Sequence, residues 1–273
     1  MGTDDGIDGG GAGFAALRDQ ARVVYGAAAG DYQLGRLEYP DAVYETLRER
    51  CGLGPGKHVL EIGPGTGQVT RHLLGAGARV VAVEPDPGFA AYLAEAFVGL
   101  RVAPSAFEDA DLADAGSDLV VAGTSFHWLD QSRALEIIGR ILRPGGWFAM
   151  WWTIFSDPTR PDPVITAATE LLGFEPGNQR GGTSFQLDER ARIHDLESHG
   201  GLVDVHAQRI QWNLPMNAAR TRALFATQMS IRRLPPPESA HTLDTIARLI
   251  DDRFEGTDDR PLLTVLYSGR KPN

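Results

Sequence analysis

The sequence predicts a doubly wound α/β fold, in which helices cover both faces of a mostly parallel sheet. From residue 57 to residue 152, short apolar segments typical of buried strands alternate with amphipathic segments of helical periodicity. Strands and helices that alternate in this way form right-handed βαβ units and hence a parallel sheet. The last two predicted strands have no crossover helix of this kind between them, so we expect them to close the sheet as an antiparallel hairpin.

Seven strands follow from the apolar pattern. They are 58–62, 79–83, 100–103, 117–123, 145–152, 202–214 and 262–269. The helices predicted between the first five strands are 68–74, 89–97 and 132–142. The expected architecture is therefore a Rossmann-like, seven-stranded sheet with helices on both faces and helical cap insertions.

The remaining segments complete the predicted organisation. The acidic, Gly-rich composition of residues 1–13 predicts disorder, because such a segment buries too little apolar surface to fold. Residues 14–50 have helical periodicity, with breaks at Gly30 and before Pro40. We assign the core to 51–152, a helical cap over the substrate site to 153–200 and 215–260, and the final strands to 201–214 and 261–273.

Composition argues against several classes of function. The net charge is −10, and Lys57 and Lys271 are the only lysines, so a nucleic acid would be repelled on average. The single cysteine, Cys51, allows neither an intrachain disulfide nor a cysteine-based zinc site. No apolar run approaches the roughly 20 residues that span a bilayer, and the N-terminus lacks the features of a signal peptide. We expect a cytoplasmic protein with no nucleic-acid or membrane partner.

A glycine-rich loop marks the predicted ligand site. Gly63, Gly65 and Gly67 occupy alternate positions directly after the first strand and before a helix. Glycine lets the backbone turn sharply and approach a ligand without a Cβ in the way. Ligands of doubly wound sheets bind outside the carboxyl ends of the strands, where this loop should lie.

Two acidic residues indicate the chemistry of that ligand. The spacing from Glu61 is E-x-G-x-G-x-G, not the G-x-G-x-x-G of dinucleotide sites. A carboxylate at Glu61 would repel a pyrophosphate but suits a cationic ammonium group, such as the amino acid end of S-adenosylmethionine. Glu84, at the end of the second strand, can accept both hydroxyls of a ribose. An NAD(P)-dependent oxidoreductase shares that last feature and is the first rival function.

The stretches VLEIGPGTG, VEPD, SDLVVAGTSFHW and LRPGGWF resemble the class I S-adenosylmethionine-dependent methyltransferases, most closely the small-molecule group that includes trans-aconitate methyltransferases. The segment GRLEYP at 35–40 is similar to an R-P-x-Y-P segment of that group, with Leu37 in place of proline. The resemblance covers residues 31–152. It implies S-adenosyl-L-methionine as cofactor, S-adenosyl-L-homocysteine as product, no metal, a small-molecule acceptor, and N-terminal helices within 14–50 that cover the cofactor site. We expect a monomer or a homodimer.

The resemblance also implies roles for individual cofactor-binding residues. Glu61 would hold the methionine ammonium through the loop, and Glu84 the ribose. Ala106 and Phe107 would close the adenine slot, with Phe107 against the base. The other implied cofactor residues are Gly63, Pro64, Gly65, Thr66, Gly67, Pro85 and Thr124.

The predicted acceptor site lies beyond the fourth and fifth strands. His127 is the candidate base, because a near-neutral pKa lets histidine take a proton from a hydroxyl or an amine; in the competing hypothesis it only shapes the pocket. Since successive strand residues point to opposite faces, Trp151 or Trp152 should be buried packing. The predicted substrate-binding residues are Tyr32, His127, Trp128, Trp152 and Phe155.

We expect transfer of a methyl group to an O, N or C atom of a metabolite or natural-product intermediate, by in-line alignment and exclusion of water. A metal-assisted catechol mechanism is disfavoured, because Gly123-Thr124 and Trp152-Thr153 stand where acids would be needed. A cofactor-binding regulatory protein or a sulfonium-assisted cyclase would also keep this cofactor pocket, so the motifs alone do not exclude either function.

Overall fold

The computed structural model of the protein describes residues 38–154, 157, 159–173, 185–226 and 229–273. The predicted disorder of residues 1–13, the predicted helices before residue 38, and the side chains of Tyr32 and Phe155 lie outside the described residues. No helix in the described part of the chain combines the length and the apolar composition needed to cross a membrane.

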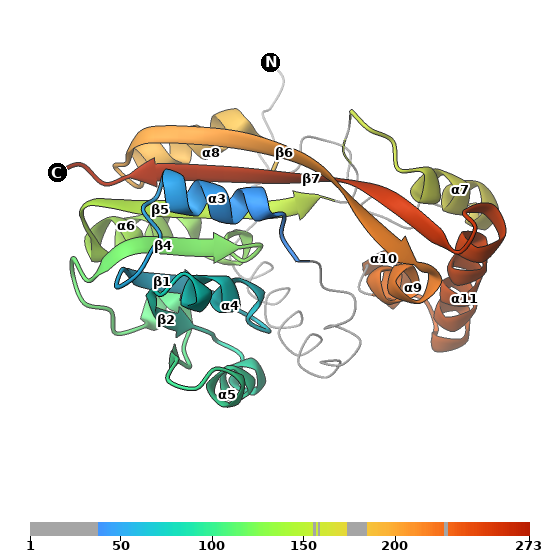
Figure 1. Cartoon of the computed structure of the whole chain (residues 1–273), viewed down its shortest axis with the longest axis horizontal. Helices are drawn as coiled ribbons and strands as arrows, with labels where there is room; N and C mark the ends of the chain where they lie inside the picture. The colour runs from blue at the N-terminus through green and yellow to red at the C-terminus, as the bar shows by residue number, and fades with distance from the viewer. Residues whose placement is uncertain (1–37, 155–156, 158, 174–184, 227–228) are drawn as a thin grey trace, which may run out of the picture.

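Seven strands form one sheet in the order β3-β2-β1-β4-β5-β7-β6 (Figure 1). β1 to β5 run parallel, and β7 is antiparallel to both β5 and β6. The predicted α/β fold with an antiparallel final hairpin is therefore confirmed. The strands are β1 (His58–Ile62), β2 (Arg79–Val83), β3 (Arg101–Ala103), β4 (Ser117–Gly123), β5 (Leu142–Ile154), β6 (Val203–Asn217) and β7 (Thr257–Arg270).

The strand order reverses between β1 and β4. From β1 the chain builds outward through β2 to β3, and then returns to place β4 on the other side of β1. The loops that follow β1 and β4 therefore leave the sheet side by side at its carboxyl edge. A crevice at such a switch point is where doubly wound sheets bind their ligands.

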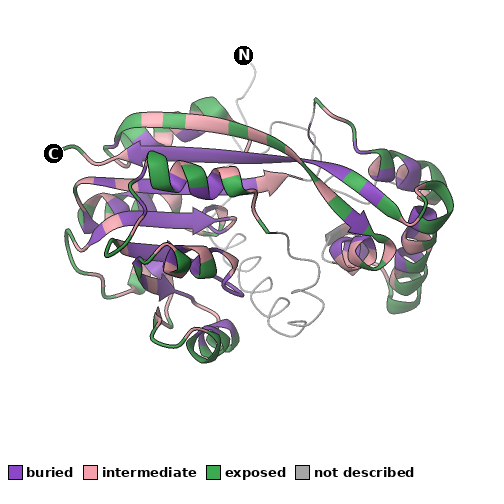
Figure 2. Cartoon of the chain, viewed as in Figure 1, coloured by how far each residue is buried: buried purple, intermediate pink, exposed green. Residues whose placement is uncertain are grey.

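Helices cover both faces of the sheet. The apolar side chains of α6 (Gln131–Ile141) and α8 (Glu189–Ser198) pack on one face, and those of α3 (Asp41–Glu49) and α4 (Gln68–Gly75) on the other. β1, β4 and β7 are almost continuously buried, whereas β6 at the edge alternates between exposed and half-buried residues (Figure 2). α5 (Pro87–Ala96) lies beside β3.

Two adjacent tryptophans of β5 belong to opposite faces. Trp152 lies in the cluster under α6 and α8, and Trp151 in the cluster under α3 and α4. Both are almost completely buried, at 1% and 0% exposure. The prediction that one of the two tryptophans is buried packing is confirmed, and the other is buried as well because helices cover both faces at this point.

A separate helical cluster lies where β6 and β7 extend past the end of β5 (Figure 1). Its core contains Val164, Phe225, Ile231, Ile246 and Ile250. α8 falls within the predicted cap span but packs on β6 and β7 instead. The helices of the cluster are α7 (Pro163–Leu172), α9 (Ala218–Ala226), α10 (Met229–Arg232) and α11 (Pro236–Arg253).

A buried ion pair connects this cluster to the sheet. Arg260 of β7, 1% exposed, donates from Nε to Asp162 Oδ2 at 2.8 Å. Asp162 also caps α7, because its Oδ1 accepts from the backbone N–H groups of Val164 and Ile165. Asp258 lies 3.7 Å from the same guanidinium, and burial raises the pKa of its carboxyl. Arg260 is therefore the cation that compensates two buried acids.

Arg260→Met should lower the free energy of unfolding by about 3–5 kcal/mol, because it leaves a buried carboxylate without its cation. Urea denaturation measures this. The control is Arg253→Met on α11, whose ion pair with Glu170 spans 3.6 Å between half-exposed side chains and should contribute at most about 1 kcal/mol. Equal small losses in both variants would contradict the assigned role of Arg260.

Candidate active site

The glycine loop after β1 depends on left-handed backbone conformations. The φ angles of Gly63, Gly65 and Gly67 are +64°, +57° and +82°. A Cβ on Gly63 would lie 2.7 Å from Ser125 Cβ, and one on Gly67 would lie 2.4 Å from the Phe97 ring. The outer two glycines are thus required by close packing within the protein as well as by backbone conformation, a constraint that the sequence did not reveal.

Glu84 joins the end of β2 to this loop. Its carboxylate is 5% exposed, and Oε2 accepts from the Gly65 backbone N–H at 3.0 Å. Oε1 accepts from the Asp86 N–H at 2.9 Å, and Asp86 caps α5 through Phe89 N–H. A carboxylate offers about four lone-pair sites, so ribose hydroxyls can share these oxygens with the backbone amides. The bond to Gly65 fixes the acid against the loop.

Glu61 is buried behind the loop. It is 2% exposed, and its Oε2 accepts from Thr70 Oγ1 of α4 at 2.6 Å. The carboxylate therefore connects β1 to the helix that follows the loop. Its predicted action on an ammonium group through the loop stays a prediction.

The end of β4 is tied to the glycine loop from the other side. Ser125 Oγ donates to the Ile62 carbonyl at 2.5 Å. Thr124 has a φ of +55°, and its N–H donates to the Trp151 carbonyl at 2.8 Å. Tyr39 reaches the same point, because its hydroxyl donates to Thr124 Oγ1 at 2.8 Å. Tyr39 was not among the predicted site residues, although it belongs to the GRLEYP segment that the resemblance singled out.

The predicted adenine segment follows β3. Phe107 begins a short 3₁₀ helix and is 2% exposed, within the apolar cluster under α6. Ala106, directly before it, is half-buried, and so is Pro85, which follows the end of β2. Phe107 therefore forms part of the core in this segment, and its contact with a base stays a prediction.

His127 lies in the 3₁₀ helix Phe126–Trp128 directly after β4. Its Nδ1 accepts a hydrogen bond from Trp152 Nε1 at 2.9 Å. Burial lowers the pKa of His127 to about 4, so the ring is neutral near pH 7. Trp128 is partly exposed, with its ring centroid 4.6 Å from that of His127. The structure thus brings together three of the predicted acceptor residues.

Three further side chains support Trp152 from behind. Phe185 meets its ring edge-on at a centroid distance of 5.5 Å, and Tyr267 lies at 6.4 Å. The Arg192 guanidinium stands 3.6 Å over the Phe185 ring. Sequence reasoning missed all three, because no motif or periodicity connects them to residues 127 and 152.

Comparison with known proteins identifies the segment that carries this site. Residues 60–150 match the family model for the methyltransferase domain. The match spans about a third of the chain. It includes the glycine loop, both acids and the His127 helix, but not Trp151 or Trp152.

Relatives extend beyond the methyltransferase domain to different degrees. An uncharacterized methyltransferase of Mycobacterium tuberculosis (strain H37Rv) is 34% identical over 128 residues, which are 47% of this chain and 51% of the relative. The match spans about half the length of that relative. An uncharacterized methyltransferase of Schizosaccharomyces pombe is 27% identical over 247 residues, 88% of this chain and 94% of the relative.

Solved structures share the fold around the domain. A protein of Anaeromyxobacter dehalogenans described as a type II methyltransferase superposes with a TM-score of 0.60 at 22% identity, over 87% of this chain and 99% of that one. Phosphoethanolamine N-methyltransferase 2 of Haemonchus contortus, in complex with S-adenosyl-L-methionine, gives 0.58 at 13% identity, over 95% and 60%. At these identities the likeness establishes the Rossmann-like methyltransferase fold.

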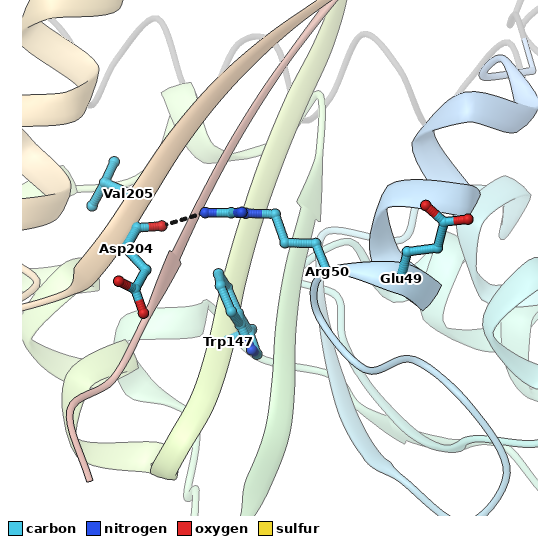
Figure 3. A pocket seen from close by; sticks show the side chains of 5 residues that line it. All are labelled: Glu49, Arg50, Trp147, Asp204 and Val205. Carbon is cyan, nitrogen blue, oxygen red and sulfur yellow. Dashed lines mark hydrogen bonds between the residues drawn. The ribbon is translucent and has the colours of Figure 1, made fainter.

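A pocket of about 560 Å³ lies elsewhere on the chain, between α3, β5 and β6 (Figure 3). Arg50 occupies it, stacked 5.0 Å over Trp147 and bonded to the Asp204 carbonyl. Trp147 pairs with Leu119 near the beginning of β4. The pocket is therefore at the amino end of the strands, at the opposite end from the glycine loop.

The described residues contain no group of three or more His, Cys, Asp or Glu side chains that could hold a metal ion. The nitrogen and oxygen groups at the switch point are instead bonded to backbone amides, to Thr70 and to Trp152. The arrangement found here is one of hydrogen-bond donors and acceptors at the carboxyl edge of the sheet.

The depressed pKa of His127 makes stability depend on pH. As the pH falls from 6.5 towards 4, the unfolded chain takes up a proton at this residue before the folded chain does. His127 therefore contributes stability near pH 7 that is lost across this range, by about 2–3 kcal/mol. Urea unfolding at several pH values should show a shallower decline for His127→Gln than for the wild type. Identical slopes would show that the folded ring titrates normally.

Proposed function

We propose that the chain is an S-adenosylmethionine-dependent methyltransferase that moves a methyl group to an O, N or C atom of a small molecule. The observation that carries this is the carboxylate of Glu84, fixed by the Gly65 N–H at the switch point beside the end of β4. It supports the proposal because a carboxylate with lone pairs left for ribose hydroxyls lies against a loop that has another buried acid behind it. The match to the methyltransferase domain supports the same conclusion.

The residues present fit this cofactor better than a dinucleotide. Glu61 and Glu84 are both buried at the loop, and two carboxylates favour the cationic ammonium over a pyrophosphate. The cofactor, when bound, supplies a methyl group on a positive sulfur. Glu84 would hold the ribose, the loop backbone and Glu61 the amino acid end, and Ala106, Phe107 and Pro85 the adenine.

The acceptor would lie beyond Thr124, His127 and Trp128. These residues follow β4, next to the loop that would hold the methyl donor. Their role is to orient the acceptor and to keep water away from the transferable methyl. Correct alignment of the two reacting groups supplies a large part of the rate enhancement in such a transfer. Tyr39 would close this edge from the N-terminal side through its bond to Thr124.

The acceptor is a small molecule in this proposal, and neither nucleic acid nor membrane is a partner. The exclusion of nucleic acid is supported by the net charge of −10, because a negatively charged protein is repelled by a phosphate backbone. The neighbour from Haemonchus contortus is named for a small-molecule acceptor. The proposal also includes kinship with trans-aconitate methyltransferases, the absence of a metal and a cytoplasmic location. It further includes a cap role for α7 and α9–α11.

Isothermal titration calorimetry should detect binding of S-adenosylmethionine and S-adenosylhomocysteine, with or without a metal chelator. Glu84→Ala should weaken that binding by about 1.5–3 kcal/mol, because charge-assisted bonds to the ribose are lost. Glu95→Ala, an acid exposed on α5, is the matched control and should bind as the wild type does.

Binding of NADH in place of both sulfur ligands would overturn the proposal and favour an NAD(P)-dependent oxidoreductase. Binding of the sulfur ligands with no release of S-adenosylhomocysteine across carboxylate, phenol, amine and carbon acceptors would favour a regulatory or cyclising protein. Unchanged affinity in Glu84→Ala would remove the ribose assignment.

A further inference from the structure

We propose that Trp152 is a positioning residue that fixes His127 in its Nε2–H tautomer, so that His127 offers the acceptor a hydrogen-bond donor and not a base. The inference rests on the proposed function and specifies the chemistry of its acceptor. It depends on one hydrogen bond, from Trp152 Nε1 to His127 Nδ1 at 2.9 Å.

The chemistry of the two rings determines the tautomer. An indole N–H can only donate, so the ring nitrogen that faces it must carry a lone pair. The facing atom is Nδ1, and a neutral imidazole with an unprotonated Nδ1 carries its proton on Nε2. A second proton at Nδ1 would set two N–H groups against each other.

The surroundings prevent Trp152 from releasing this bond. Its ring is 1% exposed and lies on a central strand, in edge contact with Phe185 and Tyr267. Rotation of the indole would require an empty volume that a close-packed interior lacks. The packing thus holds the donor of this bond in place on β5.

No charged group opposes this arrangement in the described part of the chain. Burial alone lowers the pKa of His127. Tyr267, behind Trp152, donates its hydroxyl to the Gln186 carbonyl, and burial raises its pKa to about 12, so it is neutral. Arg192 is separated from Trp152 by the Phe185 ring, which it covers. An acid that could turn the ring into an imidazolium is absent from these contacts.

The remaining ring nitrogen is the one available to a substrate. Nε2 has no hydrogen-bond partner among the residues that the structure describes, and His127 itself is half-buried at the carboxyl edge. An Nε2–H donor binds most strongly to a lone pair on an anion, so it favours an acceptor group that is already deprotonated, such as a carboxylate. A protonated phenol or ammonium nucleophile would need a base that this tautomer does not provide.

The methyl transfer to such a group then requires no proton transfer. With the cofactor bound, a carboxylate oxygen would attack the methyl carbon, the carbon–oxygen bond would form as the carbon–sulfur bond breaks, and the electron pair of the broken bond would remain on sulfur as a neutral thioether. One negative and one positive charge disappear together. The Nε2–H of His127 would hold the other carboxylate oxygen and so aim the attacking one.

Nuclear magnetic resonance tests this on the full chain saturated with S-adenosylhomocysteine. The ¹⁵N shifts of the His127 ring, assigned by their loss in His127→Gln, distinguish a protonated from an unprotonated nitrogen. We expect a single Nε2–H tautomer in the wild type. Trp152→Phe should produce a mixture of tautomers and raise the titration midpoint of the ring.

Trp151→Phe is the matched control, because it removes the same atoms from the neighbouring residue of β5, and Trp151 Nε1 is buried without a hydrogen-bond partner. It should leave the His127 ring signals unchanged. A wild-type ring protonated at Nδ1, or an unchanged tautomer in folded Trp152→Phe, would overturn the inference.

A second measurement covers the case in which Trp152→Phe does not fold. The Trp152 indole N–H of the wild type should be protected from hydrogen exchange, and its shift should change in His127→Ala. Rapid exchange of this proton would refute the bond. Failure of S-adenosylhomocysteine to bind at all would instead refute the proposed function, so the two failures are distinguishable.

Discussion

The close approach of two loops at the switch point is the constraint on which the site depends. The loop after β1 and the loop after β4 touch at Gly63 and Ser125, where a single added Cβ would lie 2.7 Å from its neighbour. The Ser125 hydroxyl fixes the same contact by donating to Ile62. Since Glu84 is bonded to this loop and His127 follows the other, their separation is set by that contact and not by flexible side chains.

Much of this could be predicted from sequence because the informative patterns are local. Strand periodicity predicted β1, β2 and β4 to the residue, and the glycine spacing placed the loop correctly. β5 was predicted too short at both ends, since Leu142 was assigned to the preceding helix and the pairing of β5 with β4 and β7 depends on partners far along the chain. The place of α8 on the sheet, not in the helical cluster, likewise depends on packing with β6 and β7.

The parts of the site that sequence did not reveal are long-range side-chain contacts. Tyr39 meets Thr124 across 85 positions, and Trp152 meets His127 across 25. His127 stays a prediction as a site residue, and the hydrogen bond that bears on its protonation comes from the indole of Trp152. The pair Trp151-Trp152 looked ambiguous because an alternating strand does not indicate which of its faces is covered; here both are, by different helices.

The length of β7 has a consequence for folding cooperativity. One continuous strand carries Arg260 in the helical cluster and Tyr267 behind Trp152, and it is paired with β6 along almost its whole length. No linker separates the two regions within this strand. Opening the helical cluster requires breaking β6–β7 hydrogen bonds of the same ladder that continues into the sheet. The cluster and the sheet therefore unfold as one cooperative unit, not as two units one after the other.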